Sequence, residues 1–308
     1  MVYGRMNTRD TVYTNTDEEY REICDFLDAL STKDPFMHWE SGRMNFWRYN
    51  VYANKDPQDR FFRENVHVWR AENRAVVALF ISEYGKDDFF VEVMPEYREI
   101  YPDILRWIDD HWANTRTNIE IDVFSDDADK IRRLETLDFQ FRCHFENKRI
   151  YDLEHTDVDY ALEDGFAVQA FSESLDYASR VALVQNAFDN PRYTEGNLRG
   201  LMSSPDYMGE YNLSVILPEG RHVAYCVGWH ERAREHAGYI EPVGTHSAYR
   251  RRGFATAVIK ECFTRMKANG IQIVEIASRA EPNVSNFLYD SLHPRTKREV
   301  HKYAKAVA

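Results

Sequence analysis

The chain repeats one apolar helical pattern at an interval of 154 residues, and this repeat limits the possible folds more than any other feature. The second copy has apolar side chains at helical spacing, namely Val258, Ile259, Cys262 and Met266. The first copy has Ile104, Leu105, Ile108 and Trp112 at the matching positions. Repetition of this kind indicates that one supersecondary unit is built twice. A length of 308 residues is sufficient for two domains with separate cores, so the repeat predicts two domains of similar fold.

A basic glycine turn precedes the helix of the second copy. Residues 237–245 read as a strand, and Arg250, Arg251, Arg252 and Gly253 follow it before the helix starts. The first N–H groups of a helix have no partner within the helix, and they carry the positive end of its dipole. A glycine there lets a phosphate approach closely. The unit therefore predicts a pyrophosphate site, and the alternative is a solvated charge run before an ordinary helix.

This unit resembles the acetyl-CoA site of the GNAT superfamily of acetyltransferases. The family signature is Gln or Arg, two residues, Gly, one residue, then Gly or Ala, and Arg250, Gly253 and Ala255 fill it. A strand at 271–277 and a helix at 283–289 follow in the family's order, although His293-Pro294 replaces the frequent Gly-Phe. The resemblance covers roughly 160–308. It implies an α/β (α+β) fold with a mixed, mostly antiparallel sheet flanked by helices, and acetyl-CoA as the cosubstrate.

The first copy lacks the signature. Glu96, Glu99 and Tyr101 occupy its three positions, and Pro102 lies beside them. Carboxylates repel a pyrophosphate, and a tyrosine ring blocks its approach. We therefore expect residues 1–155 to form a degenerate GNAT-like domain without the cofactor loop, and residues 156–308 to form an acetyl-CoA-binding GNAT domain.

Acetyl transfer from a thioester to an amine requires a base for the amine proton and an acid for the departing thiolate. The resemblance implies Tyr289 as the acid, since its reference pKa of about 10 keeps the phenol protonated at neutral pH. Glu241 is the candidate base, because it shares a strand face with Val243 and apolar neighbours would raise its pKa. A packing tyrosine and a paired structural glutamate are the alternatives, and His230 with Glu231 is the fallback base.

The cofactor contacts implied by the resemblance lie at the strand end, the turn and the later helix. Pro242 cannot donate to the strand ladder, which favours a bulge where a cofactor inserts. The expected cofactor-binding residues are Val243, Gly244, Thr245, Arg250, Arg251, Arg252, Gly253, Phe254, Ala255, Thr256, Asn283 and Asn286. The two asparagines could instead cap the helix. The basic segment 295–305 is a solvated strand face or a contact to the 3′-phosphate of CoA.

These residues predict an acetyl-CoA-dependent N-acetyltransferase that acetylates a primary amine of a small molecule or a peptide. We expect direct sequential transfer, because no cysteine is placed to attack, and no metal, because the four cysteines lack ligand spacing. One alternative is a non-catalytic CoA-binding regulatory module. Another is an aminoacyl transferase that uses charged tRNA and also carries tandem GNAT folds, but the acidic charge and intact loop argue against it.

Composition limits the remaining partners. A net charge of -12 disfavours a nucleic-acid partner, since such binding depends on neutralising phosphates. No apolar run approaches the length of a membrane span, and residues 1–10 lack the apolar core of a signal peptide. Together with cysteines that we interpret as reduced, these features predict a cytoplasmic protein without a membrane partner. The sequence does not indicate an oligomeric state.

Overall fold

The computed structural model describes residues 8–307 and contains two compact units. Unit 1 comprises Met1–Met44, Lys55–Glu146 and Glu299–Ala308, and unit 2 comprises Asn45–Asn54 and Asn147–Arg298. Neither unit is a contiguous half of the chain, unlike the expected division between residues 155 and 156. Residues 45–54 and 147–155 lie in unit 2, and residues 299–308 lie in unit 1.

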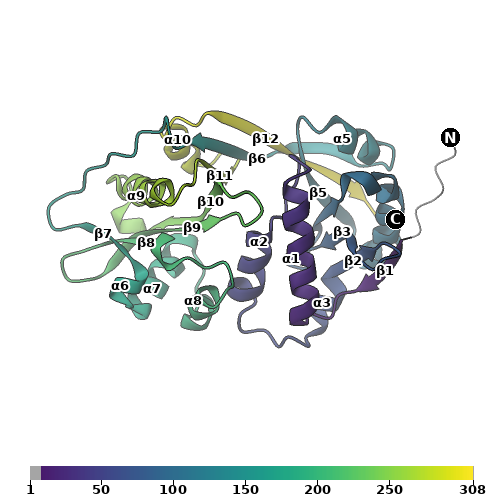
Figure 1. Ribbon diagram of the computed structural model, residues 1–308, viewed down its shortest axis with the longest axis horizontal. Helices are drawn as coiled ribbons and strands as arrows, with labels where there is room; N and C mark the ends of the chain where they lie inside the picture. Colours follow the sequence, from purple (N-terminus) through teal and green to yellow (C-terminus); the bar gives the residue numbers. More distant parts are fainter. Residues whose placement is uncertain (1–7, 308) are drawn as a thin grey trace. The chain divides into compact units, whose positions relative to one another are not determined.

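Unit 1 contains a mixed sheet in the order β1-β2-β3-β4-β5-β12. Figure 1 labels all of these strands except β4. Neighbouring strands are antiparallel except β4 and β5, which are parallel. The strands are β1 (Arg9–Val12), β2 (Val66–Arg70), β3 (Val76–Ile81), β4 (Asp88–Val93), β5 (Asn118–Phe124) and β12 (Thr296–Ala306, of which 299–306 lie in unit 1). The helices of this part of the chain are α1 (Asp17–Ser31), α2 (Ser41–Phe46), α3 (Arg60–Asn65), η2 (Pro95–Ile100), α4 (Tyr101–Trp107), η3 (Ile108–Trp112), η4 (Ala113–Thr115) and α5 (Ala128–Glu135).

Unit 2 contains the strand order β6-β11-β10-β9-β8-β7. Strands β7 to β10 pair antiparallel, and β10 pairs parallel with β11. The strands are β6 (Gln140–Asp152, of which 147–152 lie in unit 2), β7 (Ala167–Ala170), β8 (Asn212–Ile216), β9 (His222–His230), β10 (Ala237–Thr245) and β11 (Ile273–Arg279). The helices are η1 (Trp47–Val51), α6 (Phe171–Ser174), α7 (Tyr177–Phe188), α8 (Glu195–Met202), η5 (Gly209–Tyr211), η6 (Ser247–Tyr249), α9 (Phe254–Ala268) and α10 (Ser285–Asp290).

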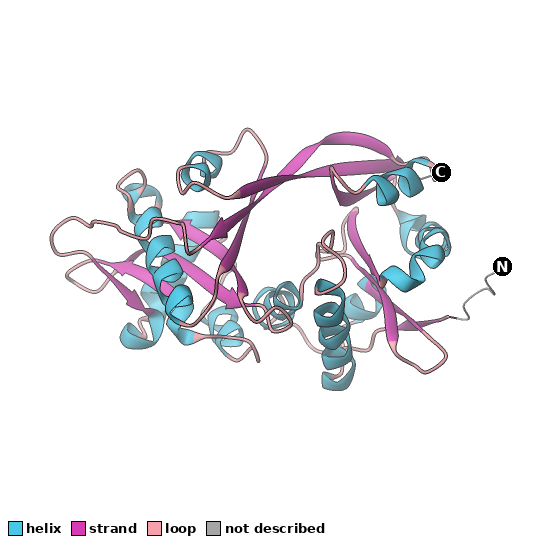
Figure 2. Cartoon of the chain, turned by 45° about the horizontal axis from the view of Figure 1, so that its top comes forward, coloured by secondary structure: helices cyan, strands magenta, loops and turns pink. Residues whose placement is uncertain are grey.

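Helices cover both faces of the unit 2 sheet (Figure 2). Successive residues of a strand point to opposite faces, and on β9 Cys226 packs with α9 whereas Val227 packs with α7 and α8. Gly228 lets α9 approach, because a Cβ there would lie 2.6 Å from Cys262 Sγ. The α9 stripe expected from the sequence is fully buried in this core.

In both units the two strands of a parallel pair are connected through an α-helix with shorter helical segments beside it: α4 lies between β4 and β5 in unit 1, and α9 lies between β10 and β11 in unit 2. The four apolar positions of the first copy are buried around α4 and η3, as those of the second copy are on α9. The predicted fold class, two α/β domains with mixed, mostly antiparallel sheets flanked by helices, is confirmed. Within residues 8–307, no helix combines the length and the apolarity needed to cross a bilayer.

Candidate active site

A cavity of about 700 Å³ opens in unit 2 between β10, the start of α9 and α10. The pairing of β10 with β11 covers Ala237–Tyr239, and the ladder from β10 to β9 shifts register between Ile240 and Val243. The bulge expected at Pro242 is therefore present. The bulge residues Ile240, Glu241, Pro242 and Val243 line the cavity. The other lining residues are Ala187, Phe188, Gly244, Thr245, Tyr249, Arg250, Arg251, Gly253, Phe254, Ala255, Thr256, Ala277, Ser278, Asn283, Val284, Ser285, Leu288 and Tyr289.

One end of the cavity is the N-terminus of α9. Gly253 is the N-cap and gives the helix no side-chain cap. The first hydrogen bond within the helix is donated by Ala257 N to Gly253 O at 2.9 Å, so the N–H groups of residues 254–256 have no partner in the helix. Gly253 has a φ of +79°, and a Cβ built there meets no atom within 4 Å. The glycine thus satisfies the left-handed backbone and leaves the approach to these N–H groups open.

The three arginines of the turn do different things. Arg250 and Arg251 line the cavity, and Arg250 Nε donates to Thr245 O at 3.3 Å. Arg252 does not line it, contrary to expectation. Its Nε donates to Glu163 Oε1 at 2.8 Å, its guanidinium lies 4.9 Å from the Phe166 ring centroid, and Glu163 raises its pKa. Two of the three arginines of the turn therefore line the cavity.

Tyr289 and Glu241 lie at the cavity wall formed by α10 and β10. Tyr289 is buried, and burial, followed by the charge of Glu241, raises the pKa of its phenol well above the usual value. Glu241 is exposed, so the apolar burial expected for its side chain is not found. The arrangement places a protonated phenol and an accessible carboxylate on one cavity.

Gly244 allows α7 and β10 to approach each other beside the cavity. A Cβ on Gly244 would lie 2.7 Å from Tyr225 Cε1 and 2.9 Å from Phe188 Cε2. The backbone of Val243, Gly244 and Thr245 consequently forms the cavity wall next to the aromatic ring of Phe188.

The two asparagines expected at the cofactor have separate positions. Asn283 lines the cavity, and its Oδ1 accepts from Ser285 N at 3.0 Å. Asn286 does not line it, because its buried side chain is engaged by Arg149, Ser278 and the backbone oxygen of Arg279.

The fallback residues also lie outside the cavity lining. A His230 ring nitrogen lies 2.9 Å from Glu235 O, and Glu231 pairs with Arg234. None of the basic residues at 295–305 lines the cavity either, although Phe188 and Ser278, which sequence reasoning did not identify, do. Phe188 was missed because its helix is remote in sequence and reaches β10 only in the folded unit.

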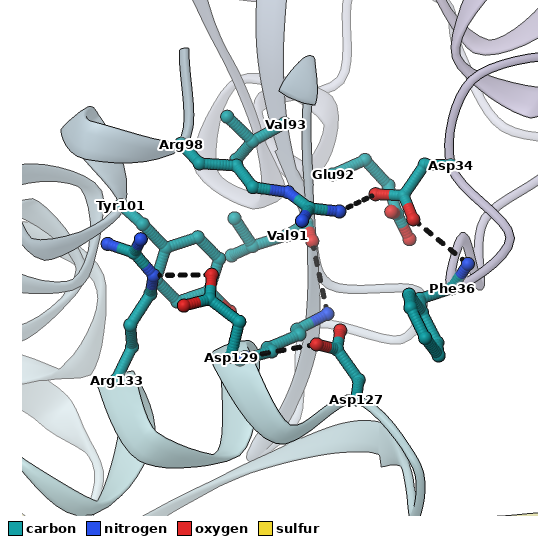
Figure 3. Close-up of a pocket in the computed structure, with 11 residues that line it drawn as sticks. Asp34, Phe36, Val91, Glu92, Val93, Arg98, Tyr101, Asp127, Asp129 and Arg133 are labelled. Atoms are coloured by element: carbon teal, nitrogen blue, oxygen red, sulfur yellow. Dashed lines mark hydrogen bonds and ion pairs between the residues drawn. The ribbon is translucent and has the colours of Figure 1, made fainter. Parts of the chain in front are cut away.

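Unit 1 has a much smaller cavity of about 30 Å³ at the equivalent position (Figure 3). It lies between β4, the start of α4 and α5, as the larger cavity lies between β10, α9 and α10. Tyr101, at the position of Ala255, is buried at its edge. Arg98 pairs with Asp34 at 2.8 Å, and Arg133 pairs with Asp129 at 2.9 Å, on either side of this tyrosine. A space of this size holds only one or two water molecules.

Comparisons with known proteins agree with this geometry. Residues 184–292 match the acetyltransferase (GNAT) family model. A GCN5-related N-acetyltransferase from Sphaerobacter thermophilus superposes with a TM-score of 0.64 and 16% identity, covering 97% of this chain and 96% of that one. A tandem GNAT protein from the clavulanic acid biosynthesis pathway superposes with a TM-score of 0.66 and 11% identity, and the match covers 98% of this chain and 99% of that one. No curated protein sequence matches the chain. Residues 184–292 are therefore similar to the GNAT family, and the chain as a whole shares the fold of tandem GNAT proteins.

Proposed function

We propose that this protein is an N-acetyltransferase that transfers the acetyl group of acetyl-CoA directly to a primary amine. The GNAT domain at 184–292 indicates acetyl transfer. The observation that carries the proposal is one cavity lined both by the start of α9, whose first N–H groups have no partner within the helix, and by Glu241 and Tyr289.

The residues of the larger cavity fit acetyl-CoA. A volume of about 700 Å³ is in the range of small-molecule sites. The N–H groups of residues 254–256 would bind the pyrophosphate, and Arg250 and Arg251 would offset its charge. The backbone of residues 243–245 would follow the pantetheine arm, and Asn283 lines the same cavity. Acetyl-CoA supplies an activated acyl group, and the protein supplies position and proton transfer.

Two side chains divide the proton transfers. Glu241 takes the amine proton, directly or through a water molecule, as the nitrogen forms its bond to the carbonyl carbon. Tyr289 gives its proton to the sulfur as the carbon–sulfur bond breaks. The resulting phenolate regains a proton from solvent, and Glu241 releases the amine proton to solvent. The products are the acetylated amine and the CoA thiol. Direct transfer is supported because no cysteine within residues 8–307 lines the cavity.

Unit 1 is proposed to bind no cofactor. Its cavity of about 30 Å³ cannot hold a pyrophosphate, and Tyr101 with two ion pairs fills the equivalent space. We therefore expect one acetyl-CoA site per chain. The acceptor is proposed to be a small-molecule or peptide amine, and the cytoplasmic location and the absence of a nucleic-acid partner stay predictions.

Calorimetry with acetyl-CoA and measurement of thiol release with a panel of primary amines test this function. We expect one bound acetyl-CoA per chain and amine-dependent release of CoA thiol. Binding without release for any amine would favour a non-catalytic CoA-binding module. A stoichiometry near two would contradict the assignment of unit 1.

The mechanism predicts that Tyr289→Phe lowers kcat without weakening acetyl-CoA binding. The phenylalanine ring preserves packing, but it cannot protonate the thiolate, and loss of a general acid typically costs about 10²- to 10⁴-fold. Glu241→Gln should instead show its largest defect at low pH, where little of the amine is free. Steady-state rates measured across pH separate the two variants. Unchanged kcat in both would exclude these side chains as proton carriers.

A further inference from the structure

A fully buried arginine contacts a residue of the cavity wall. It lies on a strand outside residues 156–308, the segment expected to form the acetyl-CoA-binding domain. Arg149 is on β6, and its side chain is 0% exposed. Its Nε donates to Asp290 Oδ1 at 2.5 Å, its Nη1 to Ser278 Oγ at 2.9 Å and its Nη2 to Asn286 Oδ1 at 2.7 Å. A single guanidinium therefore joins β6, β11 and α10 by three directional bonds.

The groups that Arg149 binds are adjacent to the proposed acid. Asp290 follows Tyr289 in α10, and Ser278 lines the same cavity as Tyr289. Ser278 Oγ also donates to Asn286 Oδ1 at 2.8 Å, which ties β11 to α10 a second time. A further residue of β6, Tyr151, donates its hydroxyl to Tyr289 O at 2.8 Å. Strand β6 thus holds the backbone and both flanks of the segment that carries Tyr289.

The charge of Arg149 also acts on the Tyr289 ring. The guanidinium carbon is 5.9 Å from the ring centroid. Burial and the charge of Glu241 raise the phenol pKa, whereas Arg149 opposes that rise. Removing the positive charge would make the phenol a weaker acid, and removing the three hydrogen bonds would release α10.

We propose that Arg149 is a positioning residue for acetyl transfer: it fixes α10 against β11 so that the Tyr289 hydroxyl faces the sulfur of the bound thioester. This inference rests on the proposed function. The proton moves from Tyr289 to the leaving sulfur as the carbon–sulfur bond breaks, so a misplaced α10 lengthens that transfer without changing how the pyrophosphate is held.

The test combines Arg149→Lys with Tyr289→Phe in the full-length chain. Lysine keeps the charge, but it cannot form the three bonds of the guanidinium fork. Release of CoA thiol from acetyl-CoA above the uncatalysed rate is measured with ethanolamine as a small primary amine, and affinity for acetyl-CoA is measured by calorimetry. We expect Arg149→Lys to lower kcat about tenfold or more in the wild-type background with an unchanged Kd. In the Tyr289→Phe background, Arg149→Lys should lower kcat less than twofold, because Arg149 acts through Tyr289.

Two further variants keep the test decisive. Arg142→Lys changes the same residue type on the same strand at an exposed site in unit 1, and it should leave kcat and Kd unchanged. If Arg149→Lys does not fold, Asp290→Asn removes the charged partner of one of the three bonds at a half-exposed position. It should lower kcat in the wild-type background only.

The outcomes separate this inference from the function on which it rests. An equal loss of kcat in both Tyr289 backgrounds, or a loss of acetyl-CoA affinity, would overturn the positioning role. If the wild-type protein turns over and neither Arg149→Lys nor Asp290→Asn changes kcat, the positioning role is overturned as well, but the acetyltransferase proposal stays intact. A wild-type protein that releases no thiol with any amine would overturn both.

Discussion

Gly253 and Gly220 share a backbone geometry but differ in position. Their φ angles are +79° and +90°, and a Cβ added to either meets no atom within 4 Å. Only Gly253 borders the N-terminus of α9, whereas Gly220 lies in the turn between β8 and β9. Substitution at these two sites therefore separates backbone strain from loss of the cofactor approach.

We expect Gly253→Val to weaken acetyl-CoA binding at least tenfold, because the side chain would occupy the approach to the N–H groups of residues 254–256. Both Gly253→Val and Gly220→Val should lower Tm, since each forces a β-branched residue into a left-handed conformation. Calorimetry and thermal unfolding measure the two effects. If Gly220→Val also weakened binding tenfold, strain rather than blocked approach would explain the loss.

Glu92 gives unit 1 a pH-dependent stability. Its buried carboxyl group accepts from His38 N at 2.9 Å and Trp39 N at 3.0 Å, and burial raises its pKa from 4.5 to about 7. The charge of Lys130 opposes this rise, and Asp34 adds to it. Between pH 4.5 and about pH 7, the Glu92 carboxyl group keeps its proton in the folded state but loses it in the unfolded state. The contribution to the free energy of unfolding is therefore full below about pH 4.5 and is lost as pH rises to about 7.

Glu92→Gln should remove this dependence, because the amide oxygen can still accept both backbone N–H groups but cannot ionise. The difference in free energy of unfolding between wild type and variant should change by about 3 kcal/mol between pH 4.5 and 7, with the variant gaining relative stability as pH rises. Denaturant unfolding at several pH values measures it. Parallel pH profiles for the two proteins would contradict the assignment.

Local patterns in the sequence predicted the turn residues well, and the failures at residue scale have long-range causes. Gly253 and the start of α9 follow from adjacent residues. Arg252 pairs with Glu163, which is 89 residues away, and a local sequence pattern cannot predict that contact. The exposure of Glu241 follows from the bulge between Ile240 and Val243, since an extra residue breaks the alternation on which its predicted face depended.

At the scale of elements, α8 is a helix whose packing partners could not be predicted from the local sequence. The two glycines of this helix, Gly196 and Gly200, face residues 49–54 of unit 2. Asn50 Nδ2 donates to Asn197 O at 3.2 Å, and Asn197 Nδ2 donates back to Asn50 O at 2.7 Å. Because these partners are about 147 residues apart, helical periodicity alone could not identify them.

Gly200→Ala should destabilise the protein although alanine is the better helix former. A Cβ at Gly200 would lie 2.1 Å from Tyr49 O and 2.5 Å from Ala53 Cβ, and overpacking of this kind typically costs about 1–3 kcal/mol. Gly209→Ala is the matched control, since its nearest neighbour would be 3.7 Å away. Thermal unfolding should show a lower Tm for Gly200→Ala only. A Tm at or above that of the wild type would mean that η1 moves aside at little cost.

At the scale of the whole molecule, the repeat predicted two similar domains but not the exchange of segments between the halves of the chain. Unit 2 requires residues 45–54 and 147–155 from the first half, including Arg149 and Tyr151. Unit 1 requires residues 299–306, which pair with β5. A repeat reports which residues share a pattern, and it carries no information on which copy of a strand completes which sheet.

A fragment of residues 156–308 should therefore fail as an independent acetyl-CoA-binding domain, even though it contains the whole signature. It lacks the strand that anchors α10 and the segment that packs on α8. Calorimetry and far-ultraviolet circular dichroism should show weak or absent binding and incomplete folding. A fragment that begins at residue 147 and is supplied with a peptide of residues 45–54 should recover part of both. Full binding by residues 156–308 alone would contradict the role of these segments.

The pairing of β5 with β12 also has a consequence for synthesis on the ribosome. Phe124 pairs with Val300, so the partner of β5 is translated about 176 residues after β5 itself. At about 5–20 residues per second, roughly 9–35 s pass before that partner exists. During this interval β5 is an unpaired sheet edge, which can pair with other nascent chains. Production of this protein should therefore depend on translation speed and on chaperones that shield the β5 edge until β12 is made.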